Sequence, residues 1–297
     1  MTAKNVVIGG GTGFIGTALV DAFKQRGLCP IIVSRMPGPF RISWHDLERD
    51  GLPKNTEAVI NVAGQNILDL RQRWSSGFKQ NVWNSRIETT KALARAVQAS
   101  SPPKIFATIS GVGYYPPDKT EYNEDIVCEK YDFLSELCHE WEDAAKLPEG
   151  SGVRQVTIRS GVVLGKNGGM IKQMFLPFYF GLGGPIGSGN QFLPWIHIDD
   201  ICNMFIHAVD KENVSGVLNG VAPQVVTNKE FTDAFAAAMW RPAKIPVPEF
   251  VLTVLFNKER AKIMIEGQKV VPKRVLESGF EYKYPTIESA CKNIAKW

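Results

Sequence analysis

The sequence lacks any uncharged apolar run of about 18 residues, the length that a membrane-spanning helix needs. Its mean hydropathy is slightly negative, so we expect a soluble protein. It also lacks a block rich in Lys and Arg, because its 34 Lys and Arg and its 30 Asp and Glu are spread along the chain. Such blocks follow a phosphate backbone, and their absence predicts no nucleic-acid partner.

Cysteine is scarce, with five residues, an odd number, and no CxxC spacing. This usage predicts reduced thiols in a reducing compartment, without disulfides, zinc or another metal site. Only residues 1–4 precede the first apolar run, which leaves no room for a targeting peptide outside the fold. The cytosol is the default compartment, although a mature chain of the mitochondrial matrix would look the same.

The chain has 297 residues, of which 44% are hydrophobic and 22% charged, a composition that suits a globular protein with two lobes. Short β-branched runs alternate with segments of helical periodicity. Strands are expected at 5–9, 30–34, 58–62, 104–110, 154–159 and 214–218, and helices from Phe14 to Gly27 and at 78–99, 133–146 and 201–209. This alternation predicts an α/β fold of the Rossmann type, a doubly wound parallel sheet with helices on both faces.

The sequence changes character after residue 165. A glycine cluster occupies 181–189, and a mostly helical tail follows from Asn228. We expect a dinucleotide-binding domain at 1–165, whose sheet is completed by parts of 193–220. Residues 166–297 are expected to form a smaller, mostly helical lobe that covers a substrate.

A glycine-rich turn lies between the first strand and the first helix. Its backbone N–H groups and the helix dipole are suited to a diphosphate, and glycine is needed because a Cβ would block the close approach. The expected cofactor-binding residues of this turn are Gly10, Thr12, Gly13, Phe14, Ile15 and Gly16. A second strand follows at the proper distance, which favours a dinucleotide site over a glycine turn without a ligand.

The second strand ends in Ser34 and Arg35. An acidic residue at this position would bind the ribose 2′-hydroxyl of NAD, whereas a hydroxyl and a guanidinium suit a 2′-phosphate. The pair therefore predicts NADP(H) as the cofactor. The alternative for Arg35 is a solvated loop cation.

Several motifs outside this turn suggest a family. They include 61–67, 71–74, 113–115, 159–165, 181–189, 195–198 and 267–272. Together with Gly10, Gly13 and Gly16 they resemble the extended short-chain dehydrogenase/reductases. Over nearly the whole chain they resemble the atypical "epimerase family" proteins, which are nucleoside-diphosphate-sugar epimerase-like and carry a short C-terminal domain of unknown function.

This resemblance implies further cofactor contacts. The stretch Asn61, Val62, Ala63 and Gly64 would pass the central ribose region, with the backbone of Val62 and Ala63 in contact. Asn81 and Arg86 would approach from the long helix, and Val163 would lie near the nicotinamide end. The alternatives are that Asn61 and Gly64 only terminate a strand and that Arg86 is a solvated helix cation.

The resemblance also implies a Ser/Thr, Tyr and Lys arrangement, in which the lysine lowers the pKa of the tyrosine. Ser110 matches the hydroxyl position, but the helix expected at 133–146 has no Tyr-x-x-x-Lys. Tyr115 and Lys119 have this spacing, yet two prolines between them exclude a helical turn. Tyr114 and Tyr115 follow the strand at the edge where doubly wound sheets bind ligands, so they remain candidates for contact with the substrate. Packing of the loop is an equally supported alternative.

Three other side chains are candidates without a selected role. His139 and His197 are further candidates for the proton donor, although the favoured role of His197 is to hold its loop by hydrogen bonds. Arg159 is either near a substrate anion or an ion-paired arginine.

Two functions therefore stay open, both with NADP(H). The leading one is an oxidoreductase or epimerase-like enzyme for an unidentified small carbonyl or sugar-nucleotide-like substrate, since hydride transfer needs mainly a positioned cofactor. The other is a non-catalytic NADPH-binding structural or sensing module, an accessory subunit of a larger complex, stabilised by its nucleotide. A homo-oligomer is compatible with both, and a protein-binding scaffold without nucleotide is the least favoured reading.

Overall fold

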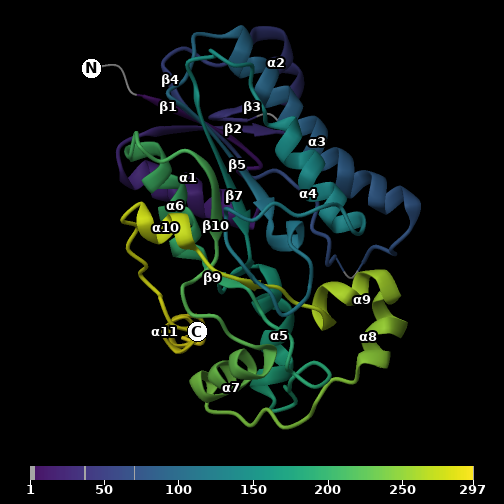
Figure 1. The fold of residues 1–297 in the computed structure, drawn as a ribbon. Helices are drawn as coiled ribbons and strands as arrows, with labels where there is room; N and C mark the ends of the chain where they lie inside the picture. The colour runs from purple at the N-terminus through teal and green to yellow at the C-terminus, as the bar shows by residue number, and fades with distance from the viewer. Residues whose placement is uncertain (1–3, 37, 70, 297) are drawn as a thin grey trace.

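The computed structural model describes residues 4–36, 38–69 and 71–296. Its centre is a seven-stranded sheet in which every neighbouring pair is parallel, in the order β10-β7-β5-β4-β1-β2-β3 (Figure 1). The strands are β1 (Asn5–Gly9), β2 (Cys29–Ser34), β3 (Arg41–Ser43), β4 (Thr56–Asn61), β5 (Ile105–Gly111), β7 (Arg154–Ser160) and β10 (Gly216–Gly220). The predicted doubly wound Rossmann-type sheet is confirmed.

The strand order reverses beside β1. The chain runs outward from β1 to β2 and β3, then returns to place β4 on the other side of β1. In the register of this pair, Gly9 lies opposite Asn61. The carboxyl ends of β1 and β4 therefore form the crevice in which doubly wound sheets bind ligands.

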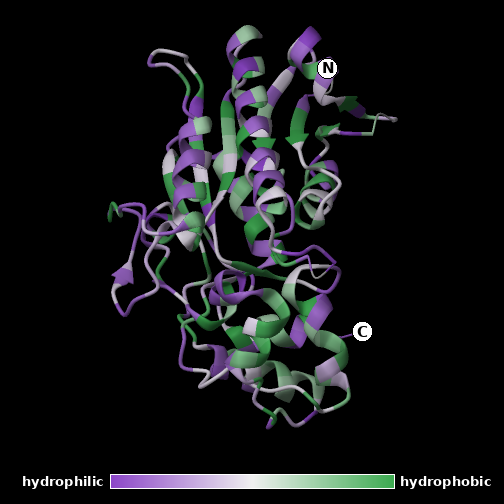
Figure 2. Ribbon diagram, turned by 90° about the vertical axis from the view of Figure 1, so that its right-hand side faces the viewer, coloured by the Kyte–Doolittle hydropathy of each residue, from purple (hydrophilic) through white to green (hydrophobic). Residues whose placement is uncertain are grey.

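Helices cover both faces of the sheet (Figure 1). The helices α1 (Phe14–Gln25) and α6 (Ile198–Asp210) pack together on one face, and α2 (Trp44–Asp50), α3 (Ser76–Ala99) and α4 (Phe133–Ala144) cover the other. Alternate residues of β1 serve the two layers, because Ile8 packs with Phe23 of α1, whereas Val7 packs with Leu93 of α3. In Figure 2 hydrophobic residues follow the strands, and hydrophilic ones gather on surrounding helices and loops.

The second part of the chain builds a smaller, mostly helical lobe below the sheet (Figure 1). Its helices are α5 (Gly169–Tyr179), α7 (Asn228–Met239), α8 (Glu249–Phe256), α9 (Lys258–Ile265) and α11 (Ile287–Ile294). The short helix α10 (Lys273–Glu277) instead packs beside β10 at the edge of the sheet, where Val275 joins the main core. A separate apolar core joins Phe178, Phe235 and Ile294 of three of these helices. Short parallel pairs link the lobe to the first part: β8 (Val162–Leu164) with β9 (Trp195–His197), and β6 (Glu121–Tyr122) with β11 (Lys269–Val270).

Most helices that face the sheet begin on a side-chain cap. Ser43 and Asp132 form capping boxes at α2 and α4, and Ser75 caps α3. Such caps satisfy N–H groups that the first turn of a helix leaves unpaired. Helix α1 differs, since its N-cap residue is Gly13 and no side chain caps it.

The structure differs from the sequence-based expectation in a few elements. Strand β3 and helix α2 were not expected, and the last sheet strand lies at Gly216–Gly220 rather than 214–218. No helix in the described ranges is long and apolar enough to cross a membrane. The proposed boundary between 1–165 and 166–297 stays a prediction.

Candidate functional site

The turn after β1 is closely packed on one side. Gly10 has a φ of +78°, and a Cβ there would lie 2.6 Å from the Cα of Ala63. A Cβ on Gly16 would collide with the carbonyl oxygen of Gly10. Both positions require glycine, because the turn is pressed between the end of β4 and the first turn of α1.

The other side of the turn is open. Thr12 and Gly13 are exposed, and a Cβ on Gly13 would have only the Gly10 oxygen, at 3.4 Å, as a neighbour. The first turn of α1 contains no acidic residue. The uncapped N–H groups and the positive end of the helix dipole are therefore available to an anion.

Two other predicted residues pack around the start of α1. Phe14 supports a glycine-rich loop, because Cβ atoms on Gly165 and Gly168 would collide with its ring. A Cβ on Gly169 would lie 3.0 Å from the carbonyl oxygen of Val163. Phe14 and Val163 thus flank one loop at the base of the second lobe, while Ile15 packs against the main core.

The end of β2 carries a free cation. Ser34 is buried, and its Oγ accepts a hydrogen bond from the Met36 N–H at 3.2 Å. Arg35 is exposed and forms no ion pair or side-chain hydrogen bond with any residue that the structure describes. A guanidinium in this state is free to bind a phosphate.

The end of β4 is held by Asn61. Its Oδ1 accepts from the Ala63 N–H at 3.1 Å, and its Nδ2 donates to Thr90 Oγ1 at 2.7 Å. The Val62 N–H donates to the Gly9 oxygen at 2.9 Å. Asn61 therefore shapes the backbone of Val62 and Ala63 beside the phosphate turn, and each of its two amide atoms forms one hydrogen bond within the protein.

Arg86 and Asn81 do not share one face of α3. Residues five apart on a helix point about 140° away from one another, and Asn81 is exposed whereas Arg86 is buried. The guanidinium lies beside Gly64, since a Cβ on that glycine would be 3.1 Å from Arg86 Cζ. Arg86 therefore points toward the end of β4, whereas Asn81 lies on the exposed side of α3; that these two residues contact the cofactor stays a prediction.

Ser110 and helix α4 meet at the end of β5. Ser110 is buried, and its Oγ has no hydrogen-bond partner in the described structure. A Cβ on Gly113 would lie 3.6 Å both from Leu134 Cβ and from Cys138 Sγ. Leu134 and Cys138 are one helical turn apart on α4, so they face this point with the spacing of the missing tyrosine and lysine. Burial raises the pKa of the Cys138 thiol to about 12.

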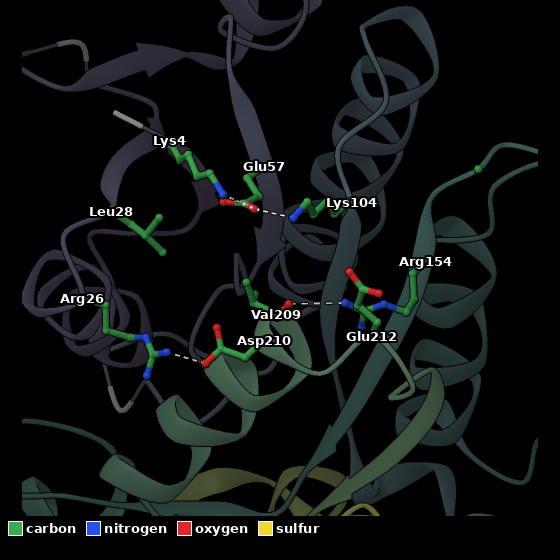
Figure 3. Close-up of a pocket in the computed structure, with 10 residues that line it drawn as sticks. Lys4, Arg26, Leu28, Glu57, Lys104, Arg154, Val209, Asp210 and Glu212 are labelled. Carbon is green, nitrogen blue, oxygen red and sulfur yellow. Dashed lines mark hydrogen bonds and ion pairs between the residues drawn. The ribbon is translucent and has the colours of Figure 1, made fainter. Parts of the chain in front are cut away.

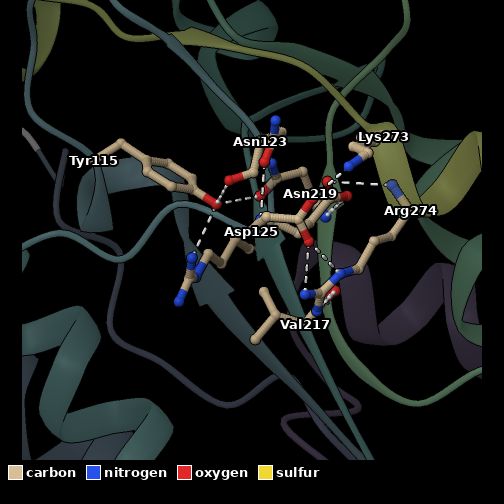
Figure 4. Close-up of polar contacts among 9 residues, drawn as sticks. Tyr115, Asn123, Asp125, Val217, Asn219, Lys273 and Arg274 are labelled. Atoms are coloured by element: carbon tan, nitrogen blue, oxygen red, sulfur yellow. Dashed lines mark hydrogen bonds and ion pairs between the residues drawn. The ribbon is translucent and has the colours of Figure 1, made fainter.

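Tyr115 is fully buried in a polar network (Figure 4). Its hydroxyl accepts from Arg159 Nη1 at 2.9 Å and contacts the acceptors Asn219 Oδ1 at 2.9 Å and the Asn123 oxygen at 3.2 Å. Burial raises its pKa to about 12. This geometry favours the loop-packing alternative, and its role as a proton donor stays a prediction.

Arg159 is an ion-paired arginine. Its Nε and Nη2 each donate to Glu142 carboxylate oxygens at 2.8 Å. Burial lowers its pKa, but hydrogen bonds to Glu142 outweigh this effect and the net shift is upward. The Tyr114 ring stacks on the guanidinium, 3.3 Å from Cζ to the ring centroid, and on His139. Tyr114 thus packs between the Arg159 guanidinium and the His139 ring, and burial lowers the pKa of His139, which favours its neutral form.

His197 caps α6. Its Nδ1 accepts from the Asp199 N–H at 3.1 Å, and its Nε2 lies 3.2 Å from Asn293 Oδ1. Burial lowers its pKa, which keeps the ring neutral as a cap requires. These contacts favour the loop-holding role.

A cavity of about 550 Å³ opens at the opposite, amino-terminal edge of the sheet (Figure 3). Glu57 there pairs with Lys4 and Lys104, each at 2.9 Å, and Arg26 pairs with Asp210. These charges satisfy one another, and ligands of such sheets bind at the carboxyl edge. The candidate site is therefore the glycine turn and its surroundings, not this cavity.

Comparison with known proteins places this site in a family. The pattern of the NAD dependent epimerase/dehydratase family matches residues 6–219, and that of DUF1731, a domain of unknown function, matches residues 247–294. The chain belongs to the NAD dependent epimerase/dehydratase family. The predicted resemblance to epimerase family proteins with a C-terminal domain of unknown function is confirmed.

Relatives within this family cover almost the whole chain. The human epimerase family protein SDR39U1 is 50% identical over 97% of this chain and 99% of its own length. A chloroplastic homologue of SDR39U1 from Arabidopsis thaliana is 34% identical over 97% of this chain and 86% of its own length.

Solved structures agree with this assignment. The crystal structure of the human SDR39U1 protein with NADPH is 49% identical, covers 98% of this chain and 99% of its own, and has a TM-score of 0.96. UDP-N-acetylglucosamine 4-epimerase from Bacillus cereus is 18% identical, covers 99% and 98%, and has a TM-score of 0.78. That second likeness shows the fold alone.

The sequence analysis did not single out Leu134 and Cys138, which have the spacing of the missing tyrosine and lysine on α4. Leu134 and Cys138 carry no chemical signal of their own in the sequence. The available signal was positional, because the two residues have the Tyr-x-x-x-Lys spacing on the predicted helix and Glu142 continues the same face. The same helical spacing could therefore also have pointed to Glu142, the carboxylate that pairs with Arg159.

Proposed function

We propose that this protein is an NADP(H)-dependent oxidoreductase or epimerase-like enzyme that acts on a small carbonyl or sugar-nucleotide-like substrate. The observation that carries the proposal is the pair of unsatisfied positive groups at the switch point of the sheet. One is the uncapped start of α1 behind the open Gly13, and the other is the free guanidinium of Arg35. The human relative crystallised with NADPH supports the same cofactor.

The residues of the site fit such a dinucleotide. The open face at Gly13 and the N–H groups of the first turn of α1 would hold the diphosphate. Arg35 and Ser34 would take the 2′-phosphate, and no acidic residue stands beside them at the end of β2 to repel it. When bound, NADPH supplies a hydride, and the protein supplies position and a dry surrounding.

Within the protein, Ser110 is the group suited to act on a carbonyl. Its buried hydroxyl lies at the carboxyl end of β5 and interacts with the weakly accepting thiol of Cys138 rather than with an oxygen or nitrogen atom of the described residues. It is therefore suited to donate a hydrogen bond to a reacting oxygen. Tyr115 is less suited, because its hydroxyl already bonds to protein groups and its pKa is raised to about 12.

A second function is favoured by one specific observation. Helix α4 presents Leu134 and Cys138 where a proton-transferring tyrosine and its lysine would face the site. Neither residue performs that chemistry, since burial keeps the thiol protonated. The second candidate is therefore an NADPH-binding module without turnover.

The cofactor assignment is tested by titrating nucleotide-free protein with NADPH and, separately, with NADH. Arg35→Ala should lower the affinity for NADPH about 10- to 100-fold, the usual effect of a lost charge-assisted contact, and leave the affinity for NADH unchanged. Arg95→Ala is the matched control, because Arg95 is an exposed cation that pairs with Glu48. Equal loss for both nucleotides, or no NADPH binding by the unaltered protein, would refute the assignment.

Oxidation of NADPH, followed by its absorbance with a panel of small carbonyl compounds, separates the two candidates. Turnover that falls in Ser110→Ala supports the enzyme. Tight NADPH binding without turnover on the panel supports the module.

A further inference from the structure

Apolar side chains are exposed at the end of the second lobe. Two segments carry them: the last turns of α5 with the loop that follows, and residues 240–248, which run along the lower end of the lobe between α7 and α8 (Figure 1). The residues of this group, here called the lobe-end patch, are Leu176, Tyr179, Phe180, Leu182, Trp240 and Ile245. At about 200 Å² for a large aromatic side chain, the three aromatic residues alone expose about 400 Å². Apolar patches of this size on a monomer commonly mark an interaction site.

The two segments pack against each other, so the patch is continuous. Arg241 Nε donates to the carbonyl oxygen of Tyr179 at 2.8 Å, and the guanidinium lies over the Tyr179 ring, 5.4 Å from its centroid. The Ile245 N–H donates to the Gly183 oxygen at 3.4 Å. The rings of Tyr179 and Phe180 contact each other edge to face, with centroids 5.5 Å apart.

Trp240 is the most exposed member of the patch. Its side chain is 89% exposed, and its backbone ends α7 in the left-handed region, with a φ of 55°. Glycine or asparagine usually occupies such a position, and a bulky residue there is rare. The unfavourable backbone and the exposed ring occur together at one residue, which points to a role outside the packing of the monomer.

The charges around the patch are of one sign. Residues 172–186 and 240–248 contain no aspartate or glutamate. Their three cations form no ion pair with a carboxylate of any residue that the structure describes. These cations are Lys172, Arg241 and Lys244. Lys172 and Leu176 lie one helical turn apart on the exposed side of α5, and Glu249, the first acidic residue after the second segment, still leaves an excess of positive charge.

This combination favours an anionic membrane over other occupants. A second copy of the chain would meet the patch with the same patch, which brings like charges together. The binding-energy centres of protein interfaces are tightly packed, whereas these side chains project from a helix end and a loop. Rings of Trp and Tyr, with long cationic side chains beside them, suit the boundary between lipid headgroups and acyl chains.

We propose that the lobe-end patch binds the surface of an anionic phospholipid membrane. The rings of Trp240 and Phe180 enter the boundary between headgroups and acyl chains, and Lys172 and Lys244 contact the lipid phosphates. This role is independent of the proposed function at the sheet.

The test is cosedimentation of the full chain with vesicles. One vesicle type holds equal parts of phosphatidylcholine and phosphatidylserine, and the other holds phosphatidylcholine alone. The protein should bind the first type, and added salt should weaken that binding. Trp240→Asn should lower the affinity about 10- to 100-fold, because a large apolar side chain is no longer buried in lipid. Lys244→Gln should lower it about five-fold, through the loss of one cation near the surface.

Folding is controlled separately. Asparagine tolerates the left-handed region, so the thermal midpoint of Trp240→Asn should equal or exceed that of the unaltered protein. Val127→Asn is the matched apolar control, because Val127 is 86% exposed in the loop between β6 and α4. Lys24→Gln on the exposed side of α1 is the matched cation control. Both controls should bind the anionic vesicles like the unaltered protein.

Three results would overturn the proposal. They are a failure of the unaltered protein to bind the anionic vesicles, equal binding to both vesicle types, and unchanged binding by Trp240→Asn. Analytical ultracentrifugation identifies the other occupant: an oligomer that Trp240→Asn dissociates, in a protein that stays off both vesicle types, would make the patch a contact between protein molecules.

Discussion

Replacing Tyr115 by phenylalanine distinguishes a structural from a catalytic tyrosine. The change removes one oxygen atom that joins Arg159 Nη1 to Asn219 Oδ1, each at 2.9 Å (Figure 4). Neither atom has another hydrogen bond within the described residues, so the change leaves two buried polar atoms without a partner. At about 1–3 kcal/mol for each of the two buried groups left without a partner, the expected loss of stability is about 2–6 kcal/mol.

A loss of about 3 kcal/mol corresponds to a fall of about 5 °C in thermal midpoint for a chain of 297 residues, at about 2.1 cal/mol/K of unfolding entropy per residue. Tyr114→Phe is the matched control, because its hydroxyl takes part in one long contact, 3.4 Å from the Cys128 nitrogen, and its ring stays stacked on Arg159. The control should lower the stability by less than about 1 kcal/mol.

Thermal unfolding of the three proteins between pH 6 and 9 is the assay. The difference between Tyr115→Phe and the unaltered protein should not vary with pH in that range, since the hydroxyl has a pKa of about 12 and stays protonated. If Tyr115→Phe keeps its midpoint within about 2 °C and instead abolishes turnover, the structural role is refuted and Tyr115 is a proton donor.

Three further outcomes are expected. Gly16→Ala should unfold at a lower temperature, because its Cβ meets the Gly10 oxygen, whereas Gly13→Ala should fold normally and lose NADPH affinity in a titration. Burial lowers the pKa of His197 in the folded protein, so the unfolded chain binds the proton more readily. The stability should therefore fall as the pH drops below about 6.5. His197→Gln should flatten that part of a plot of thermal midpoint against pH. Ser110→Ala should not lower the midpoint, because its hydroxyl has no hydrogen bond in the described structure, but should slow any turnover found.

Local sequence patterns predicted most of the fold because they act over short distances. Apolar runs and helical periodicity located six of the seven sheet strands within a few residues. Two elements missed in and around the sheet, β3 and α2, are three and seven residues long, too short for a period to show. The 11-residue helix α5 of the second lobe was not located either. The glycine turn was equally local, since the strand, the turn and the helix start are consecutive.

The site required contacts that no local pattern contains. Asn61 was expected beside the cofactor, and only the structure shows that its side chain also holds the end of β4 through Thr90 and Ala63. Asn81 and Arg86 were expected to approach the cofactor from the long helix, and only the structure shows that one is exposed and the other buried.

The sequence by itself determined the α/β fold class, the phosphate-binding turn and the preference for a 2′-phosphate, because each depends on neighbouring residues. Only the tertiary structure decided which charges are balanced. Arg159 and Glu142 come from β7 and α4, and they pair only when these elements pack. Arg86 has the same chemical nature, yet its packing partners from β4 and α4 offer no carboxylate, and that difference exists only in three dimensions.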